Sequence, residues 1–129
     1  MAAIPFAGSS DAIAMAAQVK PLLKGKVLKA GDTIGIITPA SALGDEDAIT
    51  LTKEVLTYFG FKVKEGKYIR ERYGNLAGTD AQRLEDLHAM FADKSVAGIL
   101  CIRGGAGASR LLSKIDYKLI TNNPKVLLG

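Results

Sequence analysis

Residues 96–107 read Val-Ala-Gly-Ile-Leu-Cys-Ile-Arg-Gly-Gly-Ala-Gly, a short apolar run that gives way to a glycine-rich turn. An apolar run of this length, rich in aliphatic residues, favours a strand that is buried on both faces. Glycine lets the backbone turn sharply and lets its N–H groups approach a ligand without a Cβ in the way. A helix is predicted after the turn, over residues 108–114. The stretch therefore predicts strand, tight turn and helix, which is the repeating unit of a parallel α/β sheet.

The same alternation of strand and helix extends to both sides of this stretch. Further strands are predicted over residues 33–38, 61–64 and 125–128, and further helices over residues 45–59, 79–91 and 117–121. The alternating pattern of residues 61–64 predicts a half-buried strand near a sheet edge. The order βαβαβαβ predicts an α/β fold with a parallel sheet, right-handed crossovers and flanking helices.

Apolar residues at helical spacing predict which helix faces are buried. In the helix over 45–59, which Gly60 ends, the predicted stripe is Ile49, Thr52, Val55, Leu56 and Phe59. In the helix that begins at Thr79, the predicted stripe is Leu84, Leu87, Met90 and Phe91. Thr79 and Gln82 fit the capping-box pattern at that helix start. The acidic residues around this helix are interpreted as a solvated face: Asp80, Glu85, Asp86 and Asp93.

Composition and charge divide the chain into two parts. The chain has 129 residues, of which 48% are hydrophobic and 23% charged, as in one globular domain. The net charge of +4 comes mostly from the first thirty residues, which carry Lys20, Lys24, Lys26 and Lys29 against Asp11. We expect residues 1–30 to form an arm or connector and residues 31–129 the domain. No aromatic residue interleaves the lysines, so nucleic acid and anionic lipid are disfavoured as partners of the arm.

Several classes of site and location are disfavoured by the sequence. The single cysteine, Cys101, excludes an internal disulfide and a cysteine-rich metal site, and its apolar surroundings predict a buried, inert thiol. No metal-ligand spacing appears, and no cofactor is implied. No apolar run reaches the length of a membrane span. Residues 2–17 fit either the remnant of a trimmed export signal or an irregular arm.

Sites in parallel sheets form where strands end and helices begin, which selects two loops, residues 38–44 and 103–108. The glycine turn could hold a phosphate, a dinucleotide or an oxyanion, or could serve only as a tight turn. The phosphate motifs are incomplete, because no Gly-Lys-Ser/Thr follows and residue 109 is serine. Arg103 could bind a carboxylate or form a structural ion pair. His88, the only histidine, borders an apolar stripe, so a Ser–His–Asp triad within this chain is not expected.

Several segments, taken together and in order, resemble the LD-carboxypeptidase family. They read Leu-Lys-Ala-Gly-Asp-Thr-Ile-Gly-Ile-Ile-Thr-Pro-Ala-Ser over 28–41, Leu-Ala-Gly-Thr-Asp-Ala-Gln-Arg-Leu-Glu-Asp-Leu over 76–87, Ile-Leu-Cys-Ile-Arg-Gly-Gly over 99–105, Arg-Leu-Leu over 110–112, Ile-Asp-Tyr over 115–117 and Asn-Pro-Lys-Val-Leu-Leu-Gly over 123–129. The resemblance implies a flavodoxin-like N-terminal domain, similar to class I glutamine amidotransferases, followed by a C-terminal domain. It also implies membership of a group of serine peptidases, whose best-known members remove the terminal D-alanine from murein tetrapeptides during cell-wall recycling. A sibling group, similar to the microcin C self-immunity protein, cleaves peptidyl or aminoacyl nucleotides.

The resemblance also assigns site residues. The family nucleophile lies in Gly-Tyr/Phe-Ser-Asp after the fourth strand, and Gly129 matches the first glycine of that motif. The serine would follow two positions later, and the family's glutamate and histidine come from the C-terminal domain. The oxyanion hole would include the Gly104-Gly105 turn, with Gly105 favoured. The implied substrate cleft comprises Pro39, Ala40, Ser41, Arg103 and Ala106. Ala106 departs from the large residue that the family often carries there, which leaves open how the cleft is lined.

We therefore expect a domain truncated after the fourth strand, without the nucleophile elbow, and without peptidase activity of its own. The apolar sheet surface left uncovered predicts marginal stability or self-association of this piece. The intact enzyme would bind a murein peptide, form a homodimer and work in the cytoplasm, or in the periplasm if residues 2–17 are an export remnant. A small-anion-binding module at residues 104–107 and an assembly unit remain the non-catalytic alternatives.

Overall fold

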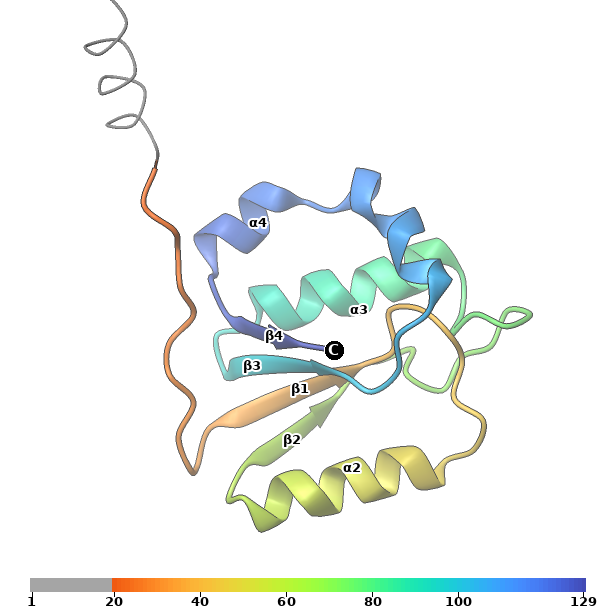
Figure 1. The fold of residues 1–129 in the computed structure, drawn as a ribbon, viewed down its shortest axis with the longest axis horizontal. Helices are drawn as coiled ribbons and strands as arrows, with labels where there is room; N and C mark the ends of the chain where they lie inside the picture. Colours follow the sequence, from red (N-terminus) through yellow and green to blue (C-terminus); the bar gives the residue numbers. More distant parts are fainter. Residues whose placement is uncertain (1–19) are drawn as a thin grey trace, which may run out of the picture.

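The computed structural model describes residues 20–129, which form a four-stranded parallel sheet with helices on both faces (Figure 1). The strands, in the order β2-β1-β3-β4 across the sheet, are β1 (Thr33–Ile37), β2 (Lys62–Glu65), β3 (Val96–Cys101) and β4 (Val126–Leu128). The helices are α2 (Asp47–Tyr58), α3 (Asp80–Ala92), α4 (Tyr117–Asn122) and the 3₁₀ helix η1 (Ala106–Lys114). The predicted α/β fold with a parallel sheet is confirmed.

The central strand β1 contributes to two cores, one on each face of the sheet. Ile36 packs with Ile49 of α2 and with Ile69, whereas Ile37 packs with Met90 and other residues of α3. This division follows from the period of two in a strand, which sends successive side chains to opposite faces. Figure 1 shows α2 alone on one side of the sheet and α3, α4 and η1 on the other. The near-continuous apolar sequence of β1 is therefore explained by burial on both faces.

The edge position predicted for the second strand is confirmed. β2 pairs only with β1 among the described strands, and its residues alternate between exposed and half-buried. Val63 points into the core beneath α2, while the neighbouring Lys62 and Lys64 are exposed. Lysine on an edge strand discourages pairing with the edge of another sheet.

The prediction of the buried face of α2 is wrong in part. Ile49 is buried and Leu56 packs in the same core, but 46% of Val55 and 63% of Phe59 are exposed. Val55 precedes Leu56 by one residue and so lies about 100° around a helix of 3.6 residues per turn. Phe59 lies beyond the last residue of the helix, Tyr58. The buried face is therefore narrower than the sequence pattern indicates.

The capping box at the start of α3 is confirmed, but the predicted buried face is rotated. Gln82 N donates to Thr79 Oγ1 at 3.2 Å, and Thr79 N donates to Gln82 Oε1 at 2.9 Å. Leu84, which the pattern placed in the stripe, is only half-buried. The buried residues of the helix are Arg83, Asp86, Leu87, Met90 and Phe91. The interpretation of Asp86 as part of a solvated face is therefore wrong, because only 4% of this residue is exposed.

The segment predicted as a helix over 108–114 is a 3₁₀ helix that begins earlier, at Ala106. Residues three apart lie above one another in a 3₁₀ helix. This spacing aligns Leu111, which is buried, with Lys114, whose Nζ lies 3.1 Å from Asp80 Oδ2. The tighter helix thus places one apolar anchor and one charged anchor on the same side.

Residues 20–30 form no regular secondary structure and run beside the sheet (Figure 1). Gly25 lies so close to β4 that a Cβ there would come within 2.5 Å of Val126 N. Leu28 covers Gly98 of β3. The division of the chain at residue 30 stays a prediction, and the interpretations of residues 2–17 concern residues outside the described part. Of the helices in the described part, none combines the length and the apolar character needed to cross a membrane.

Candidate functional site

The loops after β1 and β3 leave the sheet side by side at its carboxyl edge. The two strands are parallel neighbours, with Ile37 paired to Cys101. The pairing continues one step further, because Ile102 N donates to Ile37 O at 2.9 Å. The two loops selected from the sequence are thus brought together by the register of the central strands.

Gly105 has a backbone conformation that favours glycine, and it lies close to the loop that follows β1. Its φ of +143° is one that residues with a side chain rarely adopt. A Cβ on Gly105 would also lie 2.2 Å from Ser41 Oγ. At Gly104, in contrast, an added Cβ would have no neighbour within 4 Å. The backbone of Gly105 is therefore held directly against the loop that follows β1.

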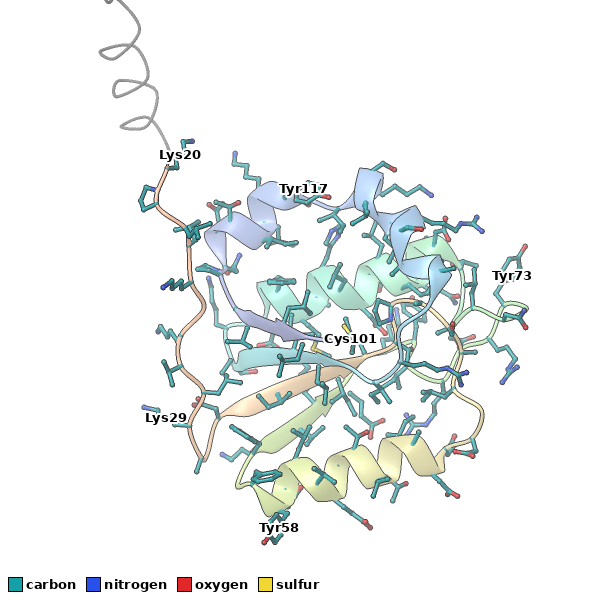
Figure 2. The ribbon with its side chains drawn as sticks, in the orientation of Figure 1. Lys20, Lys29, Tyr58, Tyr73, Cys101 and Tyr117 are labelled. Carbon is teal, nitrogen blue, oxygen red and sulfur yellow. The ribbon has the colours of Figure 1, made fainter. Side chains whose placement is uncertain are left out.

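The loop that contains Pro39, Ala40 and Ser41 is fixed by the segment between β2 and α3. Ala77 N donates to Ala40 O at 2.9 Å, and Ala42 N donates to Asn75 O at the same distance. Ala40 is fully buried, whereas Pro39 and Ser41 are half-buried. The segment between β2 and α3 thus has an anchoring side, although Tyr73 projects outward from it (Figure 2).

Arg103 and Ala106 flank the glycine turn and are both exposed. Arg103 lies just beyond the end of β3, and it forms no ion pair with any residue of the described range. Its guanidinium is therefore accessible to an anionic group at the carboxyl edge of the sheet. Ala106 is the first residue of η1.

Gly129 reaches the same edge of the sheet. A Cβ on Gly129 would lie 2.8 Å from Cys101 Cβ, at the carboxyl end of β3. Cys101 is partly buried, and Figure 2 places it within the sheet layer. Burial raises the pKa of the Cys101 thiol, which disfavours the reactive thiolate. This agrees with the predicted inert thiol.

His88 has a structural contact of its own. Its Nε2 accepts a hydrogen bond from Asp116 N at 3.0 Å, which ties the middle of α3 to the start of α4. The side chain is half-buried beside Leu84 and Leu119. The interpretation of His88 as a residue at the border of an apolar face is confirmed.

Two buried polar residues of α3 were missed by the sequence analysis. Only 1% of Arg83 is exposed, and its Nη1 donates to Pro39 O at 2.7 Å and to Gly107 O at 2.8 Å. Asp86 accepts a hydrogen bond from Tyr68 N at 3.0 Å, and burial raises the pKa of its carboxyl group. Both residues lie on the same helix face as Leu87 and Met90. Their spacing therefore indicated burial, but a pattern that counts only apolar residues leaves them out.

The surface near these loops is hollowed beside Ser41. A pocket of about 180 Å³ is lined by Ile49, residues 42–46 and residues 70–72. Larger hollows on the outer side of α2 are lined by residues of 45–58 only, away from the glycine turn. Within residues 20–129, no group of three or more His, Cys, Asp or Glu side chains could hold a metal ion.

These features define a flavodoxin-like α/β domain whose candidate site lies at the carboxyl edge of a parallel sheet, around a glycine-only turn. The sequence model of the LD-carboxypeptidase N-terminal domain matches residues 34–129. The chain belongs to the LD-carboxypeptidase family, a family of serine-type peptidases, and these residues are its N-terminal domain.

Similar proteins agree with this assignment. A probable murein peptide carboxypeptidase of Bacillus subtilis is 42% identical, over 82% of this chain and 33% of its own length. A murein tetrapeptide carboxypeptidase of Pseudomonas aeruginosa is 37% identical, over 74% of this chain and 31% of its own length. The solved structure of the microcin C7 self-immunity protein MccF with aspartyl sulfamoyl adenosine superimposes with a TM-score of 0.78 at 27% identity, covering 84% of this chain and 33% of MccF. The chain thus spans about a third of the length of the relatives it matches.

Proposed function

We propose that this chain forms the oxyanion-stabilising part of a serine-type LD-carboxypeptidase that removes the terminal D-alanine from murein tetrapeptides. One observation carries the proposal. Gly105, in a conformation reserved for glycine, lies against Ser41 at the sheet edge that Gly129 also reaches. A backbone N–H in such a turn can donate to a developing oxyanion without a side chain in the way. The names of the two bacterial relatives supply the substrate class.

In the proposed reaction, a serine two positions after Gly129 attacks the carbonyl carbon of the amide before the terminal D-residue. A histidine accepts the serine proton and later gives it to the leaving amine, while a glutamate orients the histidine. Water then releases the acyl group from the serine by the same proton transfers. The contribution of this chain is the Gly105 N–H, which donates to the oxyanion in both tetrahedral intermediates. Because the triad is expected outside residues 1–129, the chain alone should not hydrolyse the substrate.

A second candidate is the hydrolysis of aminoacyl or peptidyl nucleotides. The superposition on MccF, whose structure contains an aminoacyl adenosine analogue, favours this candidate. Ala106 is also consistent with it, because a small residue beside Gly105 leaves room for a larger group in the cleft. Both candidates use the same oxyanion site and differ in the group that leaves.

Two further proposals follow from the resemblance. We propose that the intact enzyme works in the cytoplasm on recycled murein peptides, and that its partner is a second copy of itself. Exposed Leu127 and Leu128 on β4 support an association of the sheet with further protein surface.

The experiment is a hydrolysis assay with the product of the whole reading frame that contains this chain. We expect release of D-alanine from a murein tetrapeptide, and no release by the 129-residue chain under the same conditions. Faster cleavage of an aminoacyl nucleotide than of the tetrapeptide would replace the first candidate with the second. Cleavage of neither substrate would contradict the proposal.

A further inference from the structure

We infer that Arg83 is a positioning residue of the site, whose guanidinium joins the loop after β1 to the glycine turn and so sets the backbone of Gly105 against Ser41. The consequence for catalysis rests on the proposed function. The effect on the two loops is independent of that function and can be measured on this chain.

The contacts of Arg83 connect three segments that are far apart in the sequence. Nη1 donates to the carbonyl oxygens of Pro39 at 2.7 Å and Gly107 at 2.8 Å, while Nη2 donates to Asp80 Oδ1 at 2.5 Å. Pro39 begins the loop that leads to Ser41, and Gly107 follows Gly105 by two residues. The planar guanidinium offers donors in a fixed geometry, which a flexible ammonium group does not. One side chain therefore bridges the two loops directly.

Gly107 shows that the contact requires close approach. A Cβ on Gly107 would lie 2.4 Å from Leu76 Cδ2 and 3.1 Å from Arg83 Nη1. The absence of a side chain at this position lets the guanidinium and Leu76 reach the turn together. Glycine at 105 and glycine at 107 thus serve different contacts on either side of Ala106.

The burial of Arg83 is not explained by stability alone. The residue is almost fully buried, and its Nε has no hydrogen-bond partner among residues 20–129. Buried ion pairs are often no more stabilising than apolar residues of similar volume. Asp80 is partly exposed and also contacts Lys114 and Arg110, so its charge stays compensated without Arg83. A role in holding the two loops accounts for the retained guanidinium.

Removal of the guanidinium would leave the Pro39 and Gly107 carbonyl groups without this donor. Buried carbonyl groups that lose a partner turn toward water, since leaving them unpaired is costly. Rotation of these carbonyl groups would reorient the peptide units near Gly105. An oxyanion donor displaced in this way stabilises the transition state less, even though no catalytic group has been removed.

The first test is amide hydrogen exchange in this chain, with Arg83→Met, Arg83→Lys and the matched control Arg110→Met. Arg110 also pairs with Asp80, but among residues 20–129 its side chain forms no hydrogen bond to the Pro39 or Gly107 carbonyl group. The reporters are the bonded amides of Ala42, Ala77 and Ala108, and Lys62 N reports on the far end of the sheet. We expect Arg83→Met to accelerate exchange at the reporters at least about tenfold, with Lys62 unchanged. The exchange rates of the reporter amides in Arg83→Lys should lie between those of Arg83→Met and the unchanged chain. In Arg110→Met they should equal those of the unchanged chain.

Unchanged reporter amides in a folded Arg83→Met variant would overturn the inference. If Arg83→Met does not fold, the same comparison is made with Arg83→Lys, and unchanged reporter amides in that variant would overturn the inference. Loss of folding in both variants would assign Arg83 to the stability of the fold and would also overturn the inference.

The second test is the rate of D-alanine release by the product of the whole reading frame. We expect Arg83→Met to lower kcat about 100-fold, as for a displaced catalytic group, with KM changed less than about threefold. A large increase in KM with kcat unchanged would contradict a role in placing the oxyanion donor. An unchanged protein that releases no D-alanine would refute the proposed function, whereas the exchange result would still decide the role of Arg83.

Discussion

Gly105 is the residue on which the account of the site depends most. Its positive φ disfavours any residue with a side chain, and an added Cβ would meet Ser41 Oγ, whereas Gly104 has free space around the position of a Cβ. The sequence pattern Gly-Gly-Ala-Gly predicts a turn, but it does not distinguish between the first two glycines. The distinction comes from the neighbouring loop, which is remote in sequence and therefore invisible to a local pattern.

A Gly105→Ala substitution should therefore damage the site, and Gly104→Ala should serve as its matched control. We expect Gly105→Ala to lower the free energy of unfolding by about 1–3 kcal/mol, the cost of holding a residue with a side chain in this extended, positive-φ conformation. In the product of the whole reading frame, displacement of the Gly105 N–H from the oxyanion should lower kcat by about 100-fold. Urea unfolding and D-alanine release measure the two effects. Equal effects of the two substitutions would contradict the assignment of Gly105 as the donor.

Arg83 and Asp86 illustrate the limit of sequence patterns at this scale. Both are charged, and charged residues on a helix usually face solvent. Their burial depends on partners outside the helix, namely the Pro39 and Gly107 carbonyls for Arg83 and Tyr68 N for Asp86. No local pattern contains these partners, although the spacing of both residues from Leu87 matched the buried face.

At the scale of elements, α3 is the support of the site, because it carries Arg83 and lies beneath both loops. Its N-terminus was predictable because a capping box is a local motif with fixed spacing. The helix after the glycine turn was predicted at roughly the correct place but with the wrong geometry. Gly107, Ser109 and Ser113 weaken an α-helix there, and the contacts of Leu111 and Lys114 fit the 3₁₀ spacing. These contacts are tertiary and could not be seen in the sequence.

Thr79→Ala tests the capping of this supporting helix. The substitution removes the side chain that accepts from Gln82 N, so the free energy of unfolding should fall by about 1 kcal/mol. Thr50→Ala is the control, because Thr50 is exposed within α2 and its hydroxyl bonds only to a backbone carbonyl of the preceding turn. Urea unfolding of both variants provides the measurement. A loss for Thr50→Ala as large as that for Thr79→Ala would show that the capping bond is not the cause.

At the scale of the whole molecule, the parallel sheet was predictable because strands alternate with helices from β1 to β4. The sequence pattern does not reveal that α2 has an outward apolar side, which includes Leu51, Val55 and Tyr58. The exposure of these residues depends on which face of α2 packs against the sheet. The register of β1 and β3, which brings the two site loops together, likewise results from pairing across the chain.

Ion pairs spread over the molecule predict a loss of stability in acid. Lys64, with help from Ser95, lowers the pKa of Asp93, and Arg70 and Lys53 lower the pKa of Glu65. A carboxyl group with a lowered pKa in the folded state stabilises the fold above its unfolded pKa, and this contribution is lost as the pH falls. Asp86, whose pKa burial raises, acts in the opposite direction, because its contribution is lost as the pH rises.

The groups with lowered pKa values should outweigh Asp86, so the urea midpoint should fall as the pH drops from about 5 toward 2. Asp93→Asn should flatten this dependence, since it removes the carboxylate paired with Lys64. The variant should be less stable than the unchanged chain at pH 7, and this difference should narrow, without vanishing, as the pH falls toward about 2, because the pKa of Asp93 lies far below its usual value. Parallel pH profiles for the two chains would contradict the assignment of Asp93 as a main source of acid sensitivity.

We propose that this domain holds the oxyanion site for a serine that follows β4. The most direct measurement is the reaction of a serine-directed covalent probe with the 129-residue chain and with the product of the whole reading frame, with the labelled residue mapped by mass spectrometry. The 129-residue chain should remain unlabelled, and the longer protein should be labelled at a serine two positions after Gly129. Labelling of a serine within residues 1–129, or a labelled serine elsewhere in the longer protein, would contradict it.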